Sequence, residues 1–134
     1  MRRVLSTVAI SVLSLGSMLQ AHHAISAIYD NSKPVTITGT ITEFHFVNPH
    51  PMLMVEVVDD RGRSQRWQLE MDNRFELVDV GMTADTFKRG DRVVVKGGPA
   101  RARSNELYVL QLDRAADGFR YEQVGASPRV SRTR

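Results

Sequence analysis

The sequence predicts an all-β domain with one short helix, folded as a five-stranded OB-like Greek-key barrel. Short runs in which apolar and polar residues alternate are separated by turns rich in Gly, Pro, Asp and Asn, a pattern typical of half-buried strands. A helical pattern lies between the third and the fourth of five such runs. This order, with a long bent first strand, is that of the OB fold. An up-and-down sandwich is the competing arrangement.

The first strand is expected over residues 35–47, where valine and isoleucine alternate with threonine before the parity slips. If the strand is regular, Phe44 and Phe46 lie on the threonine face and His45 points inward. A bulge near Glu43 would instead bring both rings to the core and turn His45 outward. The sequence leaves these two alternatives open.

A rigid turn follows, in which Asn48 and Pro49 are the turn-forming residues. Residues 52–58 and 64–71 are then expected to form a hairpin of two strands, joined by Asp-Asp-Arg-Gly. The side chains expected in the core are Trp67 at its centre, together with Phe44, Phe46, Val55 and Leu69.

The second half of the barrel is expected to begin with a short helix. Asp72 or Asn73 can cap its start, and Gly81 can end it. The fourth strand is expected over residues 92–96 and is halted by glycines, and the fifth covers residues 106–112.

The ends of the chain differ from this central part. A basic start, an apolar stretch and a small residue at position 21 are typical of a cleaved signal peptide, with an uncleaved anchor as the alternative. The predicted organisation is therefore a signal peptide (1–21), a His-His arm (22–33), an OB-like barrel domain (34–113) and a polar, disordered tail (114–134).

Export would place the mature protein in the periplasm. The chain has no cysteine, which excludes disulfides, thiolate metal sites and thiol catalysis. The sequence has no second long apolar run, so we expect no membrane span after cleavage.

The charge of the chain argues against nucleic acid as a partner. It has 18 basic and 15 acidic residues, but Arg2 and Arg3 leave with the signal peptide, and Arg129, Arg132 and Arg134 lie in the polar segment at the end of the chain. The folded part is therefore close to neutral, whereas nucleic-acid binding needs a basic surface.

Four segments of the chain carry a family resemblance: His22–Asp30, Lys33–Ile41, Asn48–His50 and Lys88–Asp91. They resemble a family of small exported bacterial proteins of unknown function. Members begin the mature chain with a His-His segment that ends in an aromatic residue and Asp, continue with a Lys-Pro-Val-Thr-like strand and contain an Asn-Pro-His turn. The resemblance implies a periplasmic β-barrel domain and brings no established activity.

Two departures from that family matter for a site. Ala24 and Ile25 replace a Ser-Phe pair, and residues 51–54 read Pro-Met-Leu-Met where aliphatic and aromatic residues are expected. A role resting on the histidines of the two motifs carries over from the resemblance. A role for Met52 and Met54 would be peculiar to this chain.

The four histidines predict a metal site. Cleavage after residue 21 would leave His22 with a free α-amine and an imidazole, and His23 beside it, a nitrogen set that suits Cu(II) or a similar divalent metal. His50 can supply a further nitrogen if the arm folds onto the turn, and His45 is a weaker candidate. The alternatives are an exposed terminus, a turn-locking His50 and a packed His45.

Met52 and Met54 are weaker candidates of another kind. They share strand parity with His50, so the three side chains can lie on one face. Thioethers with an imidazole form a ligand set for Cu(I). Methionines on strands more often pack against neighbours.

We expect no enzymatic activity, because no Gly-x-Ser-x-Gly elbow is present and the paired acidic residues fall in turns and caps. The alternative function is an OB-like binding module without metal, for a peptide, glycan or protein partner. The partner would be an unknown periplasmic protein or small ligand. Its anionic groups would meet the arginines at positions 61, 63, 66, 101 and 103.

Overall fold

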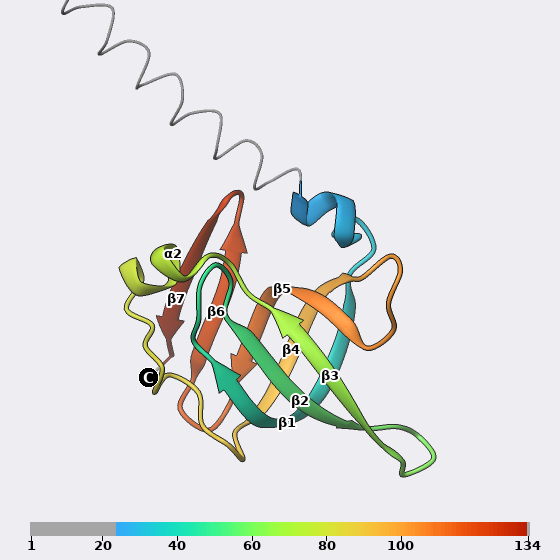
Figure 1. Cartoon of the computed structure of the whole chain (residues 1–134). Coiled ribbons are helices and arrows are strands. Elements are labelled where there is room, and N and C mark those ends of the chain that lie inside the picture. The colour runs from blue at the N-terminus through green and yellow to red at the C-terminus, as the bar shows by residue number, and fades with distance from the viewer. Residues whose placement is uncertain (1–23, 134) are drawn as a thin grey trace, which may run out of the picture.

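The computed structural model describes residues 24–133 (Figure 1). A helical turn over residues 24–28 precedes Tyr29, which forms an isolated bridge with Ala100. The elements that follow are β1 (Val35–His45), β2 (Met52–Val58), β3 (Ser64–Glu70), α2 (Arg74–Asp79), β4 (Arg92–Pro99), β5 (Glu106–Arg114), β6 (Phe119–Val124) and β7 (Ser127–Arg132).

Five of these strands close into a barrel, as predicted. Strands β3, β2, β1, β4 and β5 are antiparallel neighbours in that order, and a parallel pairing of β3 with β5 closes the ring. The helix α2 lies between β3 and β4 in the chain. This is the OB-like arrangement. Among residues 24–133, no helix has the length and apolar character needed to cross a membrane.

A bulge in β1 decides between the two alternatives for its second half. The register with β2 shifts between Ile41 and Glu43. Beyond the shift, Phe44 and Phe46 pack against the core, while the His45 side chain is 51% exposed. The strand therefore follows the alternative with a bulge near Glu43, and His45 points outward.

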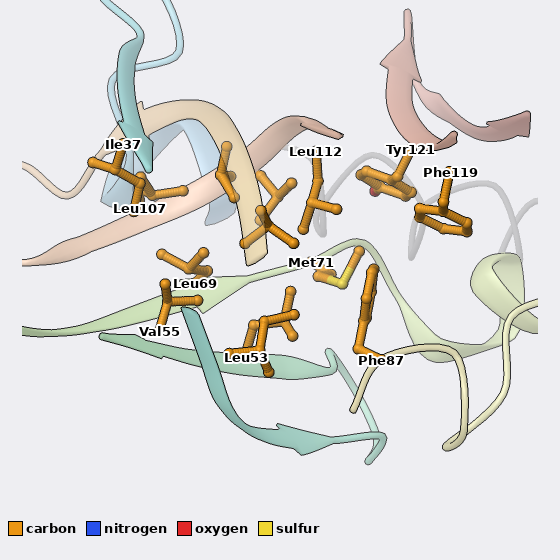
Figure 2. Close-up of a cluster of buried hydrophobic side chains, with 14 of the residues drawn as sticks. Ile37, Leu53, Val55, Leu69, Met71, Phe87, Leu107, Leu112, Phe119 and Tyr121 are labelled. Carbon is orange, nitrogen blue, oxygen red and sulfur yellow. The ribbon is translucent and has the colours of Figure 1, made fainter. Parts of the chain in front are cut away.

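The core fills the barrel with aliphatic side chains (Figure 2). Val55 and Leu69 are fully buried, as predicted. They pack with a larger set from every barrel strand, which includes Ile37, Ile41, Leu53, Val93, Val95, Leu107, Val109 and Leu112.

Trp67 does not lie at the centre of this core, contrary to expectation. It is partly buried and packs against the cluster from its margin. The parallel ladder that closes the barrel pairs β3 with β5 only from Gln68 to Glu70, so Trp67 lies one residue outside the closure. The centre is occupied instead by Leu69 and its neighbours.

Strand β4 also extends further than predicted, through Gly97 and Gly98 to Pro99. The register with β5 shifts between Lys96 and Gly97. A side chain at Gly97 would collide with Leu107 and the backbone of Tyr108. The glycine therefore allows the close approach of two strands instead of ending one.

The helix α2 is capped at its start by Asn73, one of the two residues predicted for this role. Asn73 is the N-cap, and its side chain accepts a hydrogen bond from the backbone N–H of Glu76 at 3.0 Å. Gly81, which follows the helix, has a positive φ of 88°, the conformation expected of a C-terminal glycine.

The expected disordered tail is instead a hairpin, and this corrects the sequence interpretation. β5 runs to Arg114, and β6 and β7 continue the sheet beyond it. Phe119 and Tyr121 of β6 are buried in the core, and Val130 of β7 packs against it. The segment is polar in overall composition, but the alternate residues Phe119 and Tyr121 of β6 are aromatic and face the core.

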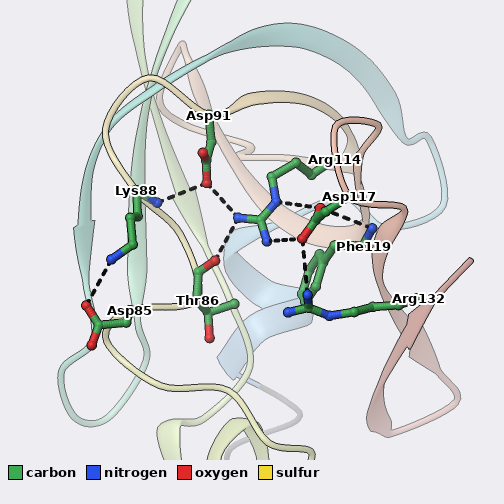
Figure 3. A network of polar contacts seen from close by, with 8 residues as sticks. All are labelled: Asp85, Thr86, Lys88, Asp91, Arg114, Asp117, Phe119 and Arg132. Atoms are coloured by element: carbon green, nitrogen blue, oxygen red, sulfur yellow. Dashed lines mark hydrogen bonds and ion pairs between the residues drawn. The ribbon is translucent and has the colours of Figure 1, made fainter. Parts of the chain in front are cut away.

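Arg114 fixes this hairpin to the barrel (Figure 3). Its side chain is 10% exposed and donates to Asp91 at 2.6 Å, to Asp117 at 2.9 Å and to the Thr86 carbonyl at 2.7 Å. The guanidinium also lies over the ring of Phe119. One buried cation thus joins segments that are distant in sequence.

We expect Arg114→Met to lower the free energy of unfolding by about 2–3 kcal/mol, less than for a fully buried pair because Asp117 is partly exposed. Asp91 would lose a buried partner, while methionine would retain contact with the rings. Urea unfolding measures the change. Arg120→Met, which breaks an exposed ion pair with Asp113, should cost less than about 1 kcal/mol. Equal losses of unfolding free energy in the two variants would contradict the role of Arg114 in holding the hairpin.

The same network predicts an acid-sensitive contribution to stability. Hydrogen bonds from Arg114 hold the pKa of the Asp117 carboxyl below its ordinary value of 3.8. Because the folded-state pKa is lowered, the stabilisation is complete above the ordinary pKa and is lost as the pH falls through the folded value. Urea unfolding at a series of pH values should show a shallower acid loss for Asp117→Asn than for the wild type. Asp85→Asn, at an exposed pair, should leave the wild-type profile unchanged.

Candidate functional site

The register of three strands builds an outward face beside the Asn-Pro-His turn. On the inside of the barrel, Phe44 of β1, Leu53 of β2 and Leu69 of β3 face the core. Their neighbours therefore face outward. We call this surface the outer face, and its side chains are Glu43, His45, Met52, Met54, Gln68 and Glu70.

Cross-strand pairs arrange the outer face in two rows. In one row, His45 lies opposite Met52, which lies opposite Glu70. In the other row, Glu43 lies opposite Met54, which lies opposite Gln68. Side chains that lie directly opposite one another on one face have Cβ atoms about 4.5–5.5 Å apart. Each methionine is thus flanked on both sides by polar groups.

The turn between β1 and β2 is tied to the start of the helix. The Asn48–Pro49 peptide bond is cis, and both residues are exposed. The Pro49 carbonyl accepts a hydrogen bond from the backbone N–H of Arg74 at 2.9 Å. Arg74 also donates to the Phe46 carbonyl at 3.3 Å. Asn48 and Pro49 therefore form the turn, as predicted, against a fixed neighbour.

His50 is held by one ring nitrogen. Its Nδ1–H donates to the Met71 carbonyl at 2.8 Å, and Glu70 Oε1 lies 3.4 Å from the same nitrogen. The side chain is 20% exposed. With the proton on Nδ1, the lone pair of the neutral ring is on Nε2. Within residues 24–133, no hydrogen bond to Nε2 is present.

Glu70 connects this histidine to the N-terminal arm. Its Oε2 accepts a hydrogen bond from the Tyr29 hydroxyl at 2.6 Å. The Tyr29 ring is buried and lies 5.9 Å from the ring of Tyr108. Burial and the nearby Glu70 carboxylate both raise the pKa of Tyr29, so its hydroxyl stays protonated and donates. One carboxylate thus contacts the arm and the turn.

His45 has a separate carboxylate partner. Its Nε2–H donates to Glu43 Oε2 at 2.8 Å, and both side chains are about half exposed. Arg66 lies 3.9 Å from the other oxygen of Glu43. His45 is therefore neither a packed core residue nor a partner of His50.

The structure places the predicted metal ligands in part. His45 lies opposite Met52 at one end of the outer face, and Met54 lies in the next row. His50 lies beside Glu70 and the Met71 carbonyl. His22 and His23, like the expected signal peptide, lie outside the described residues. Between residues 24 and 133, no three His, Cys, Asp or Glu side chains form a metal-binding group.

Sequence reasoning missed Tyr29 and Glu70. Glu70 is one of the paired acidic residues to which the sequence assigned no chemistry, yet it is the carboxylate shared by the arm and His50. The available signal was the aromatic residue followed by aspartate that ends the His-His motif, since Tyr29 occupies that position. Its partner is 41 residues away in sequence, and no local pattern indicates such a pair.

A small pocket lies between the arm and the β5–β6 surface. Its volume is ≈ 120 Å³, and its lining residues are Ile25, Ser26, Asn31, Tyr108, Leu110, Gln123 and Gly125. Gln123 donates to Asp72 at 2.6 Å and to the Tyr108 hydroxyl at 3.0 Å. These bonds fix Gln123 in the wall of the pocket. The volume is too small for a drug-sized ligand.

The arginines expected to meet an anionic ligand are mostly paired within the protein. Arg63 contacts Asp59 at 2.9 Å, and Arg103 contacts Glu106 at 3.0 Å. Arg101 lies 3.5 Å from Asp30. These ion pairs neutralise much of the positive charge that the sequence placed in the two loops.

The chain is similar to a family of unknown function and, in part of its length, to solved structures. The model of a family of unknown function (DUF6152) matches residues 9–107. No curated protein matches the chain. Among solved structures, the ZRD-deleted mutant of TiaS in complex with agmatine is similar at 13% identity and a TM-score of 0.46, over 73% of this chain and 24% of that chain.

A complex of TiaS with tRNA, AMPCPP and agmatine is similar at 12% identity and a TM-score of 0.44, over 79% of this chain and 28% of that chain. The chain therefore spans about a quarter of the length of these TiaS chains.

We expect Tyr29→Phe to lower the free energy of unfolding by about 1–3 kcal/mol, because the Glu70 carboxylate loses a donor. Hydrogen exchange should increase at the Tyr29 amide, which is bonded to Ile25, and at Arg101, which is bonded to Ile28. Amides of the barrel core should change little. Ser32→Ala, which removes an exposed hydrogen bond to Asp30, is the control. Unchanged hydrogen exchange at the Tyr29 and Arg101 amides in Tyr29→Phe would show that Glu70 does not hold the arm.

Proposed function

The chain belongs to the family of unknown function DUF6152, and we propose that it is an exported periplasmic protein, without enzymatic activity, that binds Cu(II) or a similar divalent metal. The proposed ligands are the N-terminal amine and imidazole of His22, the imidazole of His23, and Nε2 of His50. A set of nitrogen donors suits Cu(II), which has the highest affinity among the divalent first-row metals.

The observation that carries this proposal is the hydrogen bond from His50 Nδ1 to the Met71 carbonyl, at 2.8 Å. Histidines that bind metals typically donate their other ring N–H to a carbonyl or a carboxylate, which fixes the tautomer and the ring orientation. Here a carbonyl accepts this proton and the Glu70 carboxylate lies 3.4 Å away. Nε2 is thereby prepared as a donor to a metal.

The position of the arm also supports the proposal. Tyr29 is anchored on Glu70, the carboxylate that lies beside His50. Residues 24–28, which precede Tyr29, form a helical turn, so they advance by only about 1.5 Å per residue. The anchoring of Tyr29 thus fixes this short segment to Glu70, the carboxylate beside His50, and the proposal requires His22 and His23 to extend from it to the turn.

A protein partner is the second candidate, favoured by exposed apolar side chains near the turn. Val47 is 50% exposed, and Phe75 and Val78 of α2 are 70% and 46% exposed. The turn and the helix are joined through Arg74. Exposed apolar groups of this kind are typical of protein contacts, so an unknown periplasmic protein is the partner proposed for this surface.

The proposal is tested by titrating the mature protein with Cu(II) and recording EPR spectra, after mass spectrometry has established the N-terminus. We expect one-to-one binding with nitrogen hyperfine structure. One extra residue before His22 retains every side chain but removes the terminal chelate, and it should abolish tight binding. His50→Ala should weaken binding by about 10-fold or more.

Two results would overturn the proposal. Affinity that is unchanged by the extra residue would exclude the terminal chelate. Affinity that is unchanged in His50→Ala would exclude the turn as a ligand. Ser32→Ala is the control, because Ser32 is exposed, bonds to Asp30 and belongs to neither proposed metal site.

A further inference from the structure

We propose a second metal site on the outer face, formed by Met52, Met54 and His45, that binds a soft monovalent cation, Cu(I) or Ag(I). This site shares no ligand with the terminal Cu(II) site and does not rest on it. Its donors are two thioether sulfurs and the Nδ1 of one imidazole.

The register of β1 and β2 brings the three side chains to one face. Met52 and Met54 are two residues apart on β2 and therefore project from the same face. His45 lies directly opposite Met52, and Glu43 lies directly opposite Met54. Because opposite Cβ atoms are about 4.5–5.5 Å apart and diagonal ones about 7–8 Å, three long side chains can converge on one ion. The bulge in β1 is what turns His45 to this side.

Met52 and Met54 lie outside the core, unlike the other two described methionines. Met71 and Met82 are buried in the core, where methionine usually fills gaps. Met52 and Met54 are half-buried on the outer surface, and neither belongs to the core or to the residues that pack against it. Packing inside the barrel therefore does not account for the two thioethers.

The imidazole of His45 is oriented by a carboxylate. Glu43 accepts the Nε2–H of His45 at 2.8 Å, which places the lone pair of the neutral ring on Nδ1. A carboxylate that orients an imidazole in this way is typical of metal-binding histidines. No described residue forms a hydrogen bond with Nδ1 of His45.

The two thioether donors select a soft metal ion. Thioether sulfur is a soft ligand that favours Cu(I), whereas carboxylates and water suit hard cations. The nearest carboxylate on the other side of Met52 is Glu70, which is already engaged by Tyr29 and His50. Glu43 is engaged by His45. The soft donors on this part of the face are therefore the two sulfurs, with the unengaged nitrogen of His45 beside them, whereas the Gln68 amide opposite Met54 is a hard oxygen donor.

The test is a titration of the mature protein with Ag(I) as silver nitrate in chloride-free buffer, followed by NMR of methionine methyl groups. We expect one-to-one binding that shifts the Met52 and Met54 methyl signals and the His45 ring signals. The methyl signals of Met71 and Met82 should not move, since both are buried. Anaerobic competition with a chromogenic Cu(I) chelator should give the same ligand dependence for Cu(I).

The decisive variant is Met52→Leu, Met54→Leu. Leucine conserves volume at these half-buried positions, so the fold should be retained, as circular dichroism can verify. We expect Ag(I) affinity to fall by about 100-fold when both thioethers are lost. His45→Ala, at an exposed position, should also weaken binding, by about 10-fold.

The outcomes separate this site from the terminal one. Ag(I) affinity within about twofold of the wild type in the folded double-leucine variant would overturn the proposal. Loss of Ag(I) binding on adding one residue before His22 would also overturn it, because it would place the cation at the terminus. Retained Ag(I) binding in that extended protein, together with lost binding in the leucine variant, would support the outer-face site whatever the result for Cu(II).

Discussion

The bulge between Ile41 and Glu43 is the constraint on which the rest of the structure depends. Because side chains alternate across a strand, one extra residue reverses the facing of every residue after it. Here it turns Phe44 toward Phe87 in the core, with ring centroids 5.1 Å apart. It leaves His45 outside, opposite Met52. A regular strand would expose the two phenylalanine rings and bury the imidazole, and no outer-face site would exist.

Glu70 has a comparable role at the other side of this face. It stands where β3 pairs with β2 on one side and with β5 on the other. A largely buried carboxylate is costly without donors, and the Tyr29 hydroxyl meets this need from the arm. His50 lies against the other carboxylate oxygen. The arm, the closure of the barrel and the turn are therefore coupled through one charged group.

Alternation and turn residues were sufficient to predict the barrel, its strand order and a helix cap at Asp72 or Asn73, because these depend on local patterns. The sequence does not decide the bulge, because its presence depends on the packing of Phe44 against a residue far away in sequence, Phe87. The β6–β7 hairpin was missed because Arg114 holds it to Asp91, 23 residues earlier in the chain. For the site, the sequence predicted the ligand candidates but not the Tyr29–Glu70 contact, which joins residues far apart in sequence.

The two proposed sites also differ in how the fold constrains them. His50 is bonded to the Met71 carbonyl at the end of β3, so its ring orientation is tied to the path of the main chain. Met52 and Met54 project from a surface that contributes nothing to the core, and substitutions at such positions usually change stability little. The barrel can therefore carry other side chains there without loss of the fold. A soft-metal site would then be an addition to the barrel, made possible by the outward turn of His45.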